Sequence, residues 1–249
     1  MLAIHCSLAH SGAWRGIGAA LGDMATLHAF DLPCHGKSGD WDGQGVMHDT
    51  ATDMALRVLD AIGQDPIDLI GHSFGATVAL RLAIEHPERV RSLSMFEPVY
   101  FAPAMADDPQ FKQSYVQDTE DFDAALDAND RIGAARAFNA AWGGQSAWDD
   151  IPERTRSYMA ERIFFVRHSS PFLIEDCANL LAPGRFAAAA MPVLLMQGAL
   201  SAWAAPVNAA IARRLPQCTT LSFPGLDHMA PVTQPEAVAD AVRAFLHTT

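Results

Sequence analysis

Short apolar runs alternate with stretches of helical spacing along most of the chain. In residues 49–62, for example, Met54, Val58 and Ile62 recur four positions apart, which predicts an amphipathic helix. Strands that alternate with helices predict a parallel sheet with helices on both faces. The predicted strands cover residues 1–5, 25–30, the run that begins at Ile67, 90–96, 193–196 and 220–223. The predicted helices cover residues 14–21, 49–62, 74–85, 205–215 and 235–246.

The alternation stops between about residues 99 and 191. Four helical stretches follow one another here without a strand between them, at residues 122–128, 132–142, 152–165 and 174–181. Loops without secondary structure are seldom longer than about 15 residues, so this segment should be a structured insertion. We expect an α/β core from residues 1–98 and 192–249, with a helical insertion at 99–191.

Between the strand at Ile67 and the following helix lies Gly71-His72-Ser73-Phe74-Gly75. This G-x-S-x-G pattern is typical of a nucleophile elbow, a sharp turn that lifts a serine hydroxyl clear of the sheet. The residues two positions before and after the serine must be small to avoid collision, and both are glycine. Because a helix begins directly after the serine, its unpaired N–H groups can hold a developing oxyanion. A chance match is the alternative, since the bare pentapeptide is common.

Composition and charge narrow the classes of partner. The formal net charge of −12 over 249 residues argues against nucleic acid or an anionic membrane surface as a partner. No apolar run has membrane-spanning length, and the N-terminus lacks a basic region and a cleavage site, so we expect a cytoplasmic protein. The scattered cysteines favour reduced thiols, and the ten histidines show no metal-ligand spacing. No dinucleotide or phosphate-loop pattern is present, so we expect no cofactor and no metal.

Four ordered motifs together resemble the α/β-hydrolase fold family over nearly the whole chain. They are the loop after His5 with Trp14, Asp31-x-Pro33-x-His35-Gly36-x-Ser38, the elbow, and Gly225-x-Asp227-His228. The resemblance implies a mostly parallel sheet flanked by helices, and it makes the insertion a cap over the active site. Family members normally begin with an antiparallel strand pair. This chain starts at the family's third strand, so about six strands are expected.

The resemblance also implies roles for individual residues. Ser73 would be the nucleophile and His228, in the loop after the last strand, the general base. The backbone N–H groups of Phe74 and Ser7 would form the oxyanion hole. Where the family usually has His-Gly before that loop, this chain has His5-Cys6. The missing glycine puts in question whether the backbone near Ser7 approaches the site as in the family. We expect His5, His10 and His35 to line the pocket or stabilise loops.

The third triad member departs from the family pattern. The acid usually follows the strand at 193–196, but Ser201 stands at that position, and no carboxylate occurs between residues 191 and 220. A serine cannot stabilise an imidazolium as a carboxylate does. Glu97 ends the strand beside the one that carries Ser73, a place where haloalkane dehalogenases and certain lipases have their acid. A helix cap or an arginine pair is the alternative role for Glu97, and Asp227 is a rival carboxylate whose adjacency to His228 makes the contact awkward.

These features favour a serine hydrolase that cleaves a small ester, thioester or lactone through an acyl-enzyme. The partner would be a small molecule with an apolar acyl part, because aromatic residues are frequent in the insertion. They are Phe101, Phe111, Phe122, Phe138, Trp142, Phe164, Phe165 and Phe172. Two alternatives stay open: a carbon–carbon bond hydrolase or small-molecule lyase of the same fold, and a non-catalytic small-ligand-binding protein.

Overall fold

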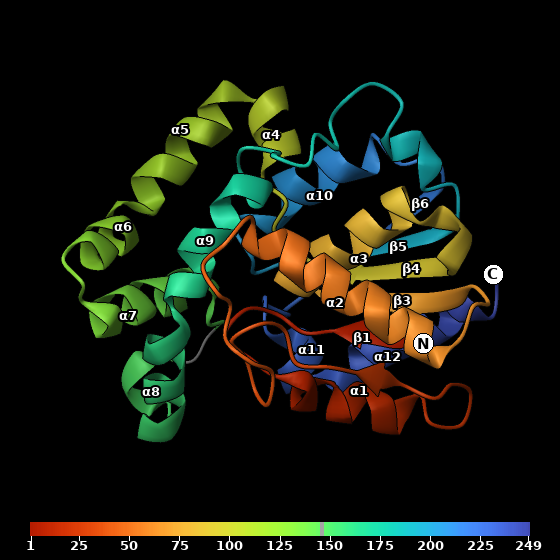
Figure 1. The fold of residues 1–249 in the computed structure, drawn as a ribbon, viewed down its shortest axis with the longest axis horizontal. Helices are drawn as coiled ribbons and strands as arrows, with labels where there is room; N and C mark the ends of the chain where they lie inside the picture. Colours follow the sequence, from red (N-terminus) through yellow and green to blue (C-terminus); the bar gives the residue numbers. More distant parts are fainter. Residues whose placement is uncertain (145–146) are drawn as a thin grey trace.

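The computed structural model describes residues 1–144 and 147–249, and its core is one six-stranded sheet (Figure 1). The strand order is β2-β1-β3-β4-β5-β6, and every neighbouring pair is parallel, as predicted. Parallel strands end at a common edge, so the loops after them meet there. The strands are β1 (Leu2–Ile4), β2 (His28–Ala29), β3 (Ile67–His72), β4 (Val90–Phe96), β5 (Val193–Gly198) and β6 (Cys218–Phe223).

Both edge strands differ from the prediction. The strand expected over residues 25–30 is only two residues long, β2, and both residues are exposed. β2 is an edge strand and pairs with β1 alone, so only one neighbouring strand stabilises its extended conformation. β6 begins at Cys218, two residues earlier than predicted, and is mostly exposed on the opposite edge. Edge strands carry weaker patterns because fewer of their side chains are buried.

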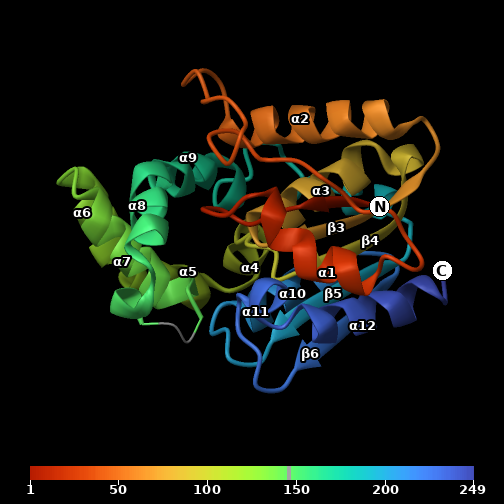
Figure 2. The same cartoon turned by 90° about the horizontal axis from the view of Figure 1, so that it is seen from below.

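Alternate strand residues face two separate apolar clusters. Leu69 and Leu195 belong to the cluster beneath α2 (Met47–Ile62), α3 (Phe74–Glu85) and α10 (Ala204–Ala212). Ile70 and Leu194, one position along, belong to the cluster beneath α1 (Arg15–Ala20) and α12 (Pro235–Leu246). This alternation follows from the strand period of two. Figure 2 shows α2 and α12 on opposite sides of the sheet.

The insertion between β4 and β5 is helical and lies at one end of the molecule, on the left in Figures 1 and 2. Its helices are α4 (Ala102–Asp107), α5 (Pro109–Asp118), α6 (Glu120–Asp127), α7 (Arg131–Trp142), α8 (Glu153–Arg162) and α9 (Phe164–Leu173). The predicted helix at 152–165 is two helices that meet at Ile163, and α4 and α5 were not predicted. Domain boundaries at residues 98 and 192 stay a prediction.

The helix predicted over residues 174–181 is wrong. This segment consists of turns, and Asp176 organises it with its backbone in the left-handed region at φ 51°. The Asp176 carboxylate accepts hydrogen bonds from the backbone N–H groups of Leu180 and Leu181 at 2.7 and 2.9 Å. Asp side chains offer the backbone such alternatives to helical bonding. The apolar spacing that indicated a helix instead places Leu180 in the core.

Two further observations concern the predicted absence of membrane and metal partners. Across residues 1–144 and 147–249, no helix has both the length and the apolar character needed to cross a membrane. In the same residues, no three His, Cys, Asp or Glu side chains are grouped as metal ligands would be. The four cysteines are free thiols, and burial raises the pKa of Cys6 to about 12.

Candidate active site

Ser73 sits at the turn between β3 and α3 with φ 55° and ψ −121°, a combination that costs a non-glycine residue energy. The flanking glycines explain how this turn fits into the sheet. A Cβ on Gly71 would lie 2.4 Å from the Cα of Ala76, and one on Gly75 would lie 2.1 Å from the carbonyl oxygen of Ile4. The Ser73 N–H is fixed by the carbonyl oxygen of Phe96 at 2.9 Å. The elbow predicted from the sequence is therefore present in its strained form.

Glu97 and His228 are brought together by the fold. Glu97 follows β4 directly with φ 46°, and its Oε2 lies 2.6 Å from Nδ1 of His228. Its other oxygen, Oε1, accepts the backbone N–H of Gly198 at 2.7 Å. Both side chains are buried, at 1% and 7% exposed. A carboxylate accepts hydrogen bonds, so the histidine proton lies on Nδ1, and Nε2 is the nitrogen that can accept a proton.

The other two candidates for the third triad position are arranged differently. The Ser201 hydroxyl is buried and makes no hydrogen bond with any described residue. The Asp227 carboxylate accepts the backbone N–H of Met229 at 2.9 Å, a turn within its own loop. The structure thus brings Glu97, on the strand next to the elbow, to Nδ1 of His228.

The side chain of His72 supports the loop that carries His228. Its Nε2 donates to the carbonyl oxygen of His228 at 2.7 Å, and the two rings lie 5.0 Å apart. Burial, reinforced by the neighbouring His228, holds the pKa of His72 well below its usual range. A neutral imidazole with its one proton on Nε2 serves here as a structural support for the loop that carries His228.

Side chains hold three of the peptide groups in the loop that carries Ser7. The Nδ1 of His5 donates to the carbonyl oxygen of Cys6 at 2.7 Å, and Nε2 of His35 accepts the N–H of Leu8 at 3.0 Å. The hydroxyl of Tyr158 donates to the carbonyl oxygen of Ala9 at 2.8 Å. These bonds define the orientation of the Ser7 peptide even though Cys6 stands where the family has glycine.

His5 and His35 also tie two core loops to each other. Each accepts a backbone N–H from the other loop: His5 Nε2 from Leu32 at 2.9 Å, and His35 Nε2 from Leu8. Burial lowers the pKa of His5 to about 3 and that of His35 to about 4, so both are neutral at pH 7. They stabilise loops, as expected. His10 instead accepts the N–H of Gly12 at an exposed turn.

Sequence reasoning missed Tyr158 and Arg162, which connect α8 to the same loops. The Tyr158 hydroxyl accepts the N–H of Gly36 at 3.0 Å while it donates to Ala9. Arg162 donates to the carbonyl oxygen of Cys34 at 3.0 Å, and its guanidinium lies 3.8 Å from the centre of the Tyr158 ring. The hydrogen bonds from α8 to these loops each span more than 120 residues of sequence, and no local sequence motif predicts them.

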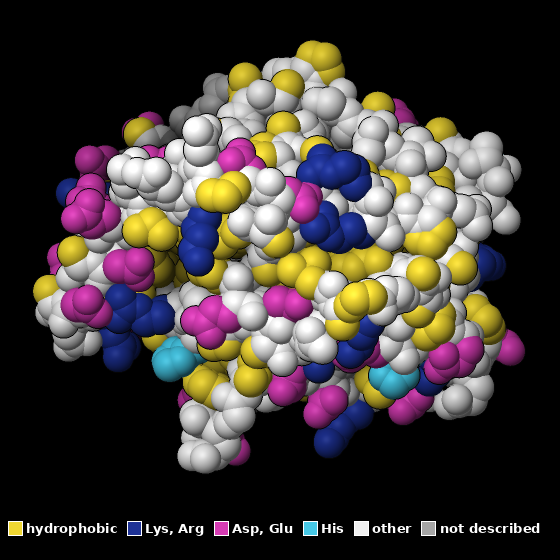
Figure 3. Space-filling view, turned by 90° about the horizontal axis from the view of Figure 1, so that it is seen from above, with side chains coloured by type: hydrophobic (Ala, Val, Ile, Leu, Met, Phe, Trp, Pro, Cys, Tyr) yellow, Lys and Arg dark blue, Asp and Glu magenta, His cyan; other side chains and the backbone are white. Residues whose placement is uncertain are grey.

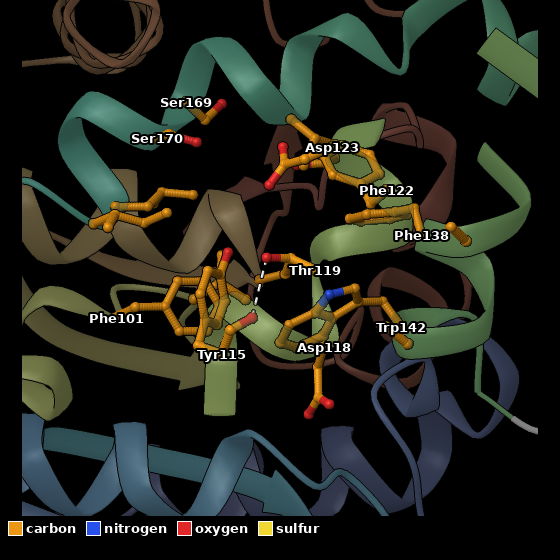
Figure 4. Close-up of a pocket in the computed structure, with 18 residues that line it drawn as sticks. Phe101, Tyr115, Asp118, Thr119, Phe122, Asp123, Phe138, Trp142, Ser169 and Ser170 are labelled. Atoms are coloured by element: carbon orange, nitrogen blue, oxygen red, sulfur yellow. Dashed lines mark hydrogen bonds between the residues drawn. The ribbon is translucent and has the colours of Figure 1, made fainter. Parts of the chain in front are cut away.

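A cavity that is partly open to solvent lies between the elbow and the insertion, with about 790 Å³ of empty space when its open side is included. Ser73 and Ser7 both line it. Figure 4 shows the part of the lining that comes from the insertion, including Phe101, Phe122 and Trp142. Of the eight aromatic residues named above in the insertion, four line the cavity: Phe101, Phe122, Phe138 and Trp142. Phe111, Phe165 and Phe172 are buried in the core, and Phe164 lines a separate hollow. The ring of Trp142 lies 4.9 Å from that of His228, which places the histidine beside the cavity.

Comparison with known proteins decides the family. The model of the alpha/beta hydrolase fold matches residues 1–235, nearly the whole chain. The chain belongs to the α/β hydrolase fold family. Among solved structures, MenH from S. aureus superposes on this α/β hydrolase with a TM-score of 0.74 at 17% identity, over 99% of this chain and 92% of that one. A likeness at that identity concerns the fold.

Curated relatives match this α/β hydrolase over shorter segments. A 2-hydroxymuconate semialdehyde hydrolase of a Pseudomonas species is 56% identical over 80 residues, which are 32% of this chain and 28% of that protein. The pimeloyl-[acyl-carrier protein] methyl ester esterase of Nitrosomonas europaea is 34% identical over 93 residues, 37% of this chain and 34% of the relative. The matched segments thus span about a third of these relatives' length.

Proposed function

We propose that this chain is a serine hydrolase that cleaves a small ester, thioester or lactone through an acyl-enzyme on Ser73. The observation that carries the proposal is the 2.6 Å contact between Glu97 and His228, beside a cavity that Ser73 lines. A buried carboxylate on Nδ1 orients the imidazole and stabilises its charged form. A serine in an elbow is the nucleophile that such a histidine activates.

In the acylation step, Nε2 of His228 removes the hydroxyl proton of Ser73 while Oγ attacks the carbonyl carbon of the substrate. The negative charge that develops on the carbonyl oxygen is held by backbone N–H groups of Phe74 and Ser7. The imidazolium, stabilised by Glu97, then returns its proton to the departing alcohol or thiol. Water attacks the acyl-enzyme by the same sequence of proton transfers and releases the acid.

The lining of the cavity supports an apolar acyl part in the substrate. Besides its aromatic residues, the cavity has an aliphatic wall of Val99, Val166, Leu173 and Ile174. Removing an acyl chain from water against such a wall contributes about 0.8 kcal/mol per buried methylene. The insertion would then act as the cap that selects the substrate, with core residues 1–98 and 192–249 carrying the chemistry.

A carbon–carbon bond hydrolase is the second candidate. It is favoured by one observation, the 56% identity over 80 residues to a 2-hydroxymuconate semialdehyde hydrolase. The same serine and histidine would serve such a reaction. A non-catalytic binding protein is less well supported, because it would not need the buried Glu97–His228 pair.

The experiment is a turnover assay with 4-nitrophenyl esters of graded acyl length, lactones, thioesters and a vinylogous 1,5-diketone, each with wild-type protein and Ser73→Ala. We expect ester, thioester or lactone turnover that Ser73→Ala abolishes. Turnover of the diketone alone would instead support the carbon–carbon hydrolase. If no substrate is turned over and Ser73 does not react with a fluorophosphonate probe, the binding-protein alternative holds.

A further inference from the structure

Among the described residues, six side chains that carry a hydroxyl group line the cavity. Ser73 belongs to the elbow and Ser7 to the loop beside it. The other four come from the insertion and are Tyr115, Thr119, Ser169 and Ser170. Figure 4 shows Ser169 and Ser170 on one side of the cavity and Tyr115 and Thr119 on the other. The hydrogen bonds of these four side chains distinguish two kinds.

Two of the four hydroxyl groups are paired within their own segments of chain. The Ser169 hydroxyl donates to the carbonyl oxygen of Phe165 at 2.8 Å, and the Thr119 hydroxyl donates to that of Tyr115 at 3.0 Å. Serine and threonine often bond in this way to a backbone carbonyl one turn earlier. The hydroxyl groups of Thr119 and Ser169 therefore do not depend on a ligand for a partner.

The hydroxyl groups of Tyr115 and Ser170 are not paired in this way. Neither makes a hydrogen bond with any residue in 1–144 or 147–249. The chain has two other tyrosines, Tyr100 and Tyr158, and the hydroxyl group of each donates a hydrogen bond inside the protein. A polar group that lacks a partner inside a protein costs stability, so each such group calls for an explanation.

The ring of Tyr115 is held in place by its neighbours. Its centre lies 4.6 Å from that of Phe101 and 5.5 Å from that of Trp203. Burial, and to a smaller extent the Asp123 carboxylate, raises the pKa of Tyr115. The hydroxyl group therefore keeps its proton at neutral pH and can donate a hydrogen bond. A few fixed polar groups in an apolar cavity are what orients a small ligand.

The acidic side chains of the insertion are different in kind. They gather on its surface, at the left of Figure 3. Asp123, which also lines the cavity, is 54% exposed and pairs with Arg167 at 3.2 Å. Charged groups that water solvates need no partner from a ligand, whereas an unpaired hydroxyl group in an apolar wall does.

We propose that Tyr115 and Ser170 form a subsite that binds an uncharged oxygen atom in the acyl part of the substrate, and that both are specificity-determining residues. The proposal rests on the proposed hydrolase function and narrows its substrate class. The acyl chain is apolar except for one carbonyl, ether or hydroxyl oxygen, which accepts a hydrogen bond from these side chains. A plain alkyl chain would leave both hydroxyl groups unpaired, and a site built to hydrogen-bond its substrate discriminates against the analogue that lacks the group.

The test compares esters of equal chain length. The substrates are 4-nitrophenyl heptanoate and the 4-nitrophenyl esters of 4-oxo-, 5-oxo- and 6-oxoheptanoic acid, in which a ketone replaces one methylene. Each kcat/KM is divided by the rate constant for hydrolysis by hydroxide, which removes the effect of the ketone on the reactivity of the ester. We expect wild-type protein to prefer one oxo ester to the heptanoate by about two- to tenfold, the contribution of a net hydrogen bond.

Two pairs of matched variants locate the subsite. Tyr115→Phe and Ser170→Ala should each reduce the preference for that oxo ester, by up to about tenfold. Tyr100→Phe and Ser169→Ala remove hydroxyl groups that are paired inside the protein, so they should leave the preference unchanged. A wild-type protein without a preference, or a preference that survives both Tyr115→Phe and Ser170→Ala, would overturn the proposal.

Urea denaturation checks the premise that the Tyr115 hydroxyl has no partner inside the protein. Tyr115→Phe should unfold at the same urea concentration as wild type or at a higher one, because it loses no hydrogen bond. Tyr100→Phe loses its bond to Asp176 and should unfold at a lower concentration. If Tyr115→Phe were destabilised as much as Tyr100→Phe, the hydroxyl would have a partner in the folded chain and the proposal would fail.

Failure of the hydrolase proposal gives a different result. No ester would then be turned over, and isothermal titration calorimetry would measure the binding of the same four esters to Ser73→Ala. One oxo ester should still bind about two- to tenfold more tightly than the heptanoate, and adding Tyr115→Phe should remove the difference. Equal affinities for all four esters would overturn the subsite independently of catalysis.

Discussion

Oε2 of Glu97 lies 2.6 Å from Nδ1 of His228, although 131 residues separate the two in sequence. Two features of the sheet produce this contact. β4 ends at Phe96, so Glu97 leaves the sheet at the same edge as Ser73, and its second oxygen is fixed by Gly198 at the end of β5. The carboxylate that contacts His228 therefore comes from the end of β4, the strand next to β3, which leads to the nucleophile. Ser201 occupies the position after β5.

Replacement of Glu97 by glutamine should lower kcat about 10³- to 10⁴-fold with the fold intact, because an amide cannot stabilise the imidazolium and can select the wrong tautomer. The measurement is kcat on a 4-nitrophenyl ester, with circular dichroism to check the fold. Asp227→Asn is the matched control and should keep near-normal turnover. Near-normal turnover by Glu97→Gln would remove Glu97 from the triad.

Ser201→Ala tests the rival position directly. The Ser201 hydroxyl is buried without a hydrogen-bond partner among the described residues, so its removal deletes no contact. We expect kcat within about twofold of wild type and a free energy of unfolding that is unchanged or higher, since a buried unpaired hydroxyl costs about 1–3 kcal/mol. The measurements are ester turnover and urea denaturation. A tenfold loss of kcat would mean that Ser201 helps to orient His228.

The core could be predicted from sequence because its signals are local. The elbow glycines, the strand at 90–96 and the histidine loop each depend on residues a few positions apart, and β4 has the predicted bounds. Glu97 could be proposed by elimination, since the usual position holds serine. Its role in catalysis stays a prediction.

The insertion was harder to predict because its local structure depends on contacts between residues that are distant in sequence. The turns at 174–181 follow from the carboxylate of Asp176, whose Oδ1 also accepts the hydroxyl of Tyr100 at 2.6 Å, from 76 residues away. Tyr158 likewise reaches Ala9 across 149 residues. The spacing of apolar residues carries no information about partners that are distant in sequence. It therefore predicted a helix at 174–181 and did not predict the contacts between α8 and the loop that carries Ser7.

Tyr158→Phe should lower kcat about tenfold with KM within about twofold, because the hydroxyl positions the loop that carries the Ser7 N–H. Loss of an oxyanion donor costs about 10²- to 10³-fold, and a displaced donor should cost less. Tyr100→Phe is the matched control: it also removes a hydrogen-bonded tyrosine hydroxyl, the one that contacts Asp176. Both variants should lose comparable stability. Equal kcat values for Tyr158→Phe and Tyr100→Phe would mean that Tyr158 has only a structural role.

The buried His35 predicts a loss of stability in acid. Its pKa is about 4 in the folded protein, against about 6.5 in an unfolded chain. Between these values the unfolded state binds more protons, so the free energy of unfolding falls as the pH is lowered from about 6.5 towards 4. This residue contributes roughly 3 kcal/mol to the fall at its full extent.

Urea denaturation between pH 7 and pH 4.5 measures that dependence. His35→Gln should be less stable than wild type at pH 7, because it loses the bond to the Leu8 N–H. It should also show a shallower fall in acid, since one buried titrating group is gone. His28→Gln, at an exposed histidine of β2, should keep the wild-type slope. Parallel slopes for wild type and His35→Gln would show that His35 does not drive the acid sensitivity.

The most direct test of the proposed mechanism is the intact mass of the protein after reaction with a fluorophosphonate. We predict that wild-type protein gains one phosphonyl group, that peptide mapping places it on Ser73, and that Ser73→Ala gains none. His228→Ala should react far more slowly, because it lacks the base. A wild-type protein that gains no mass, or a Ser73→Ala variant that is modified at the same rate, would contradict the account.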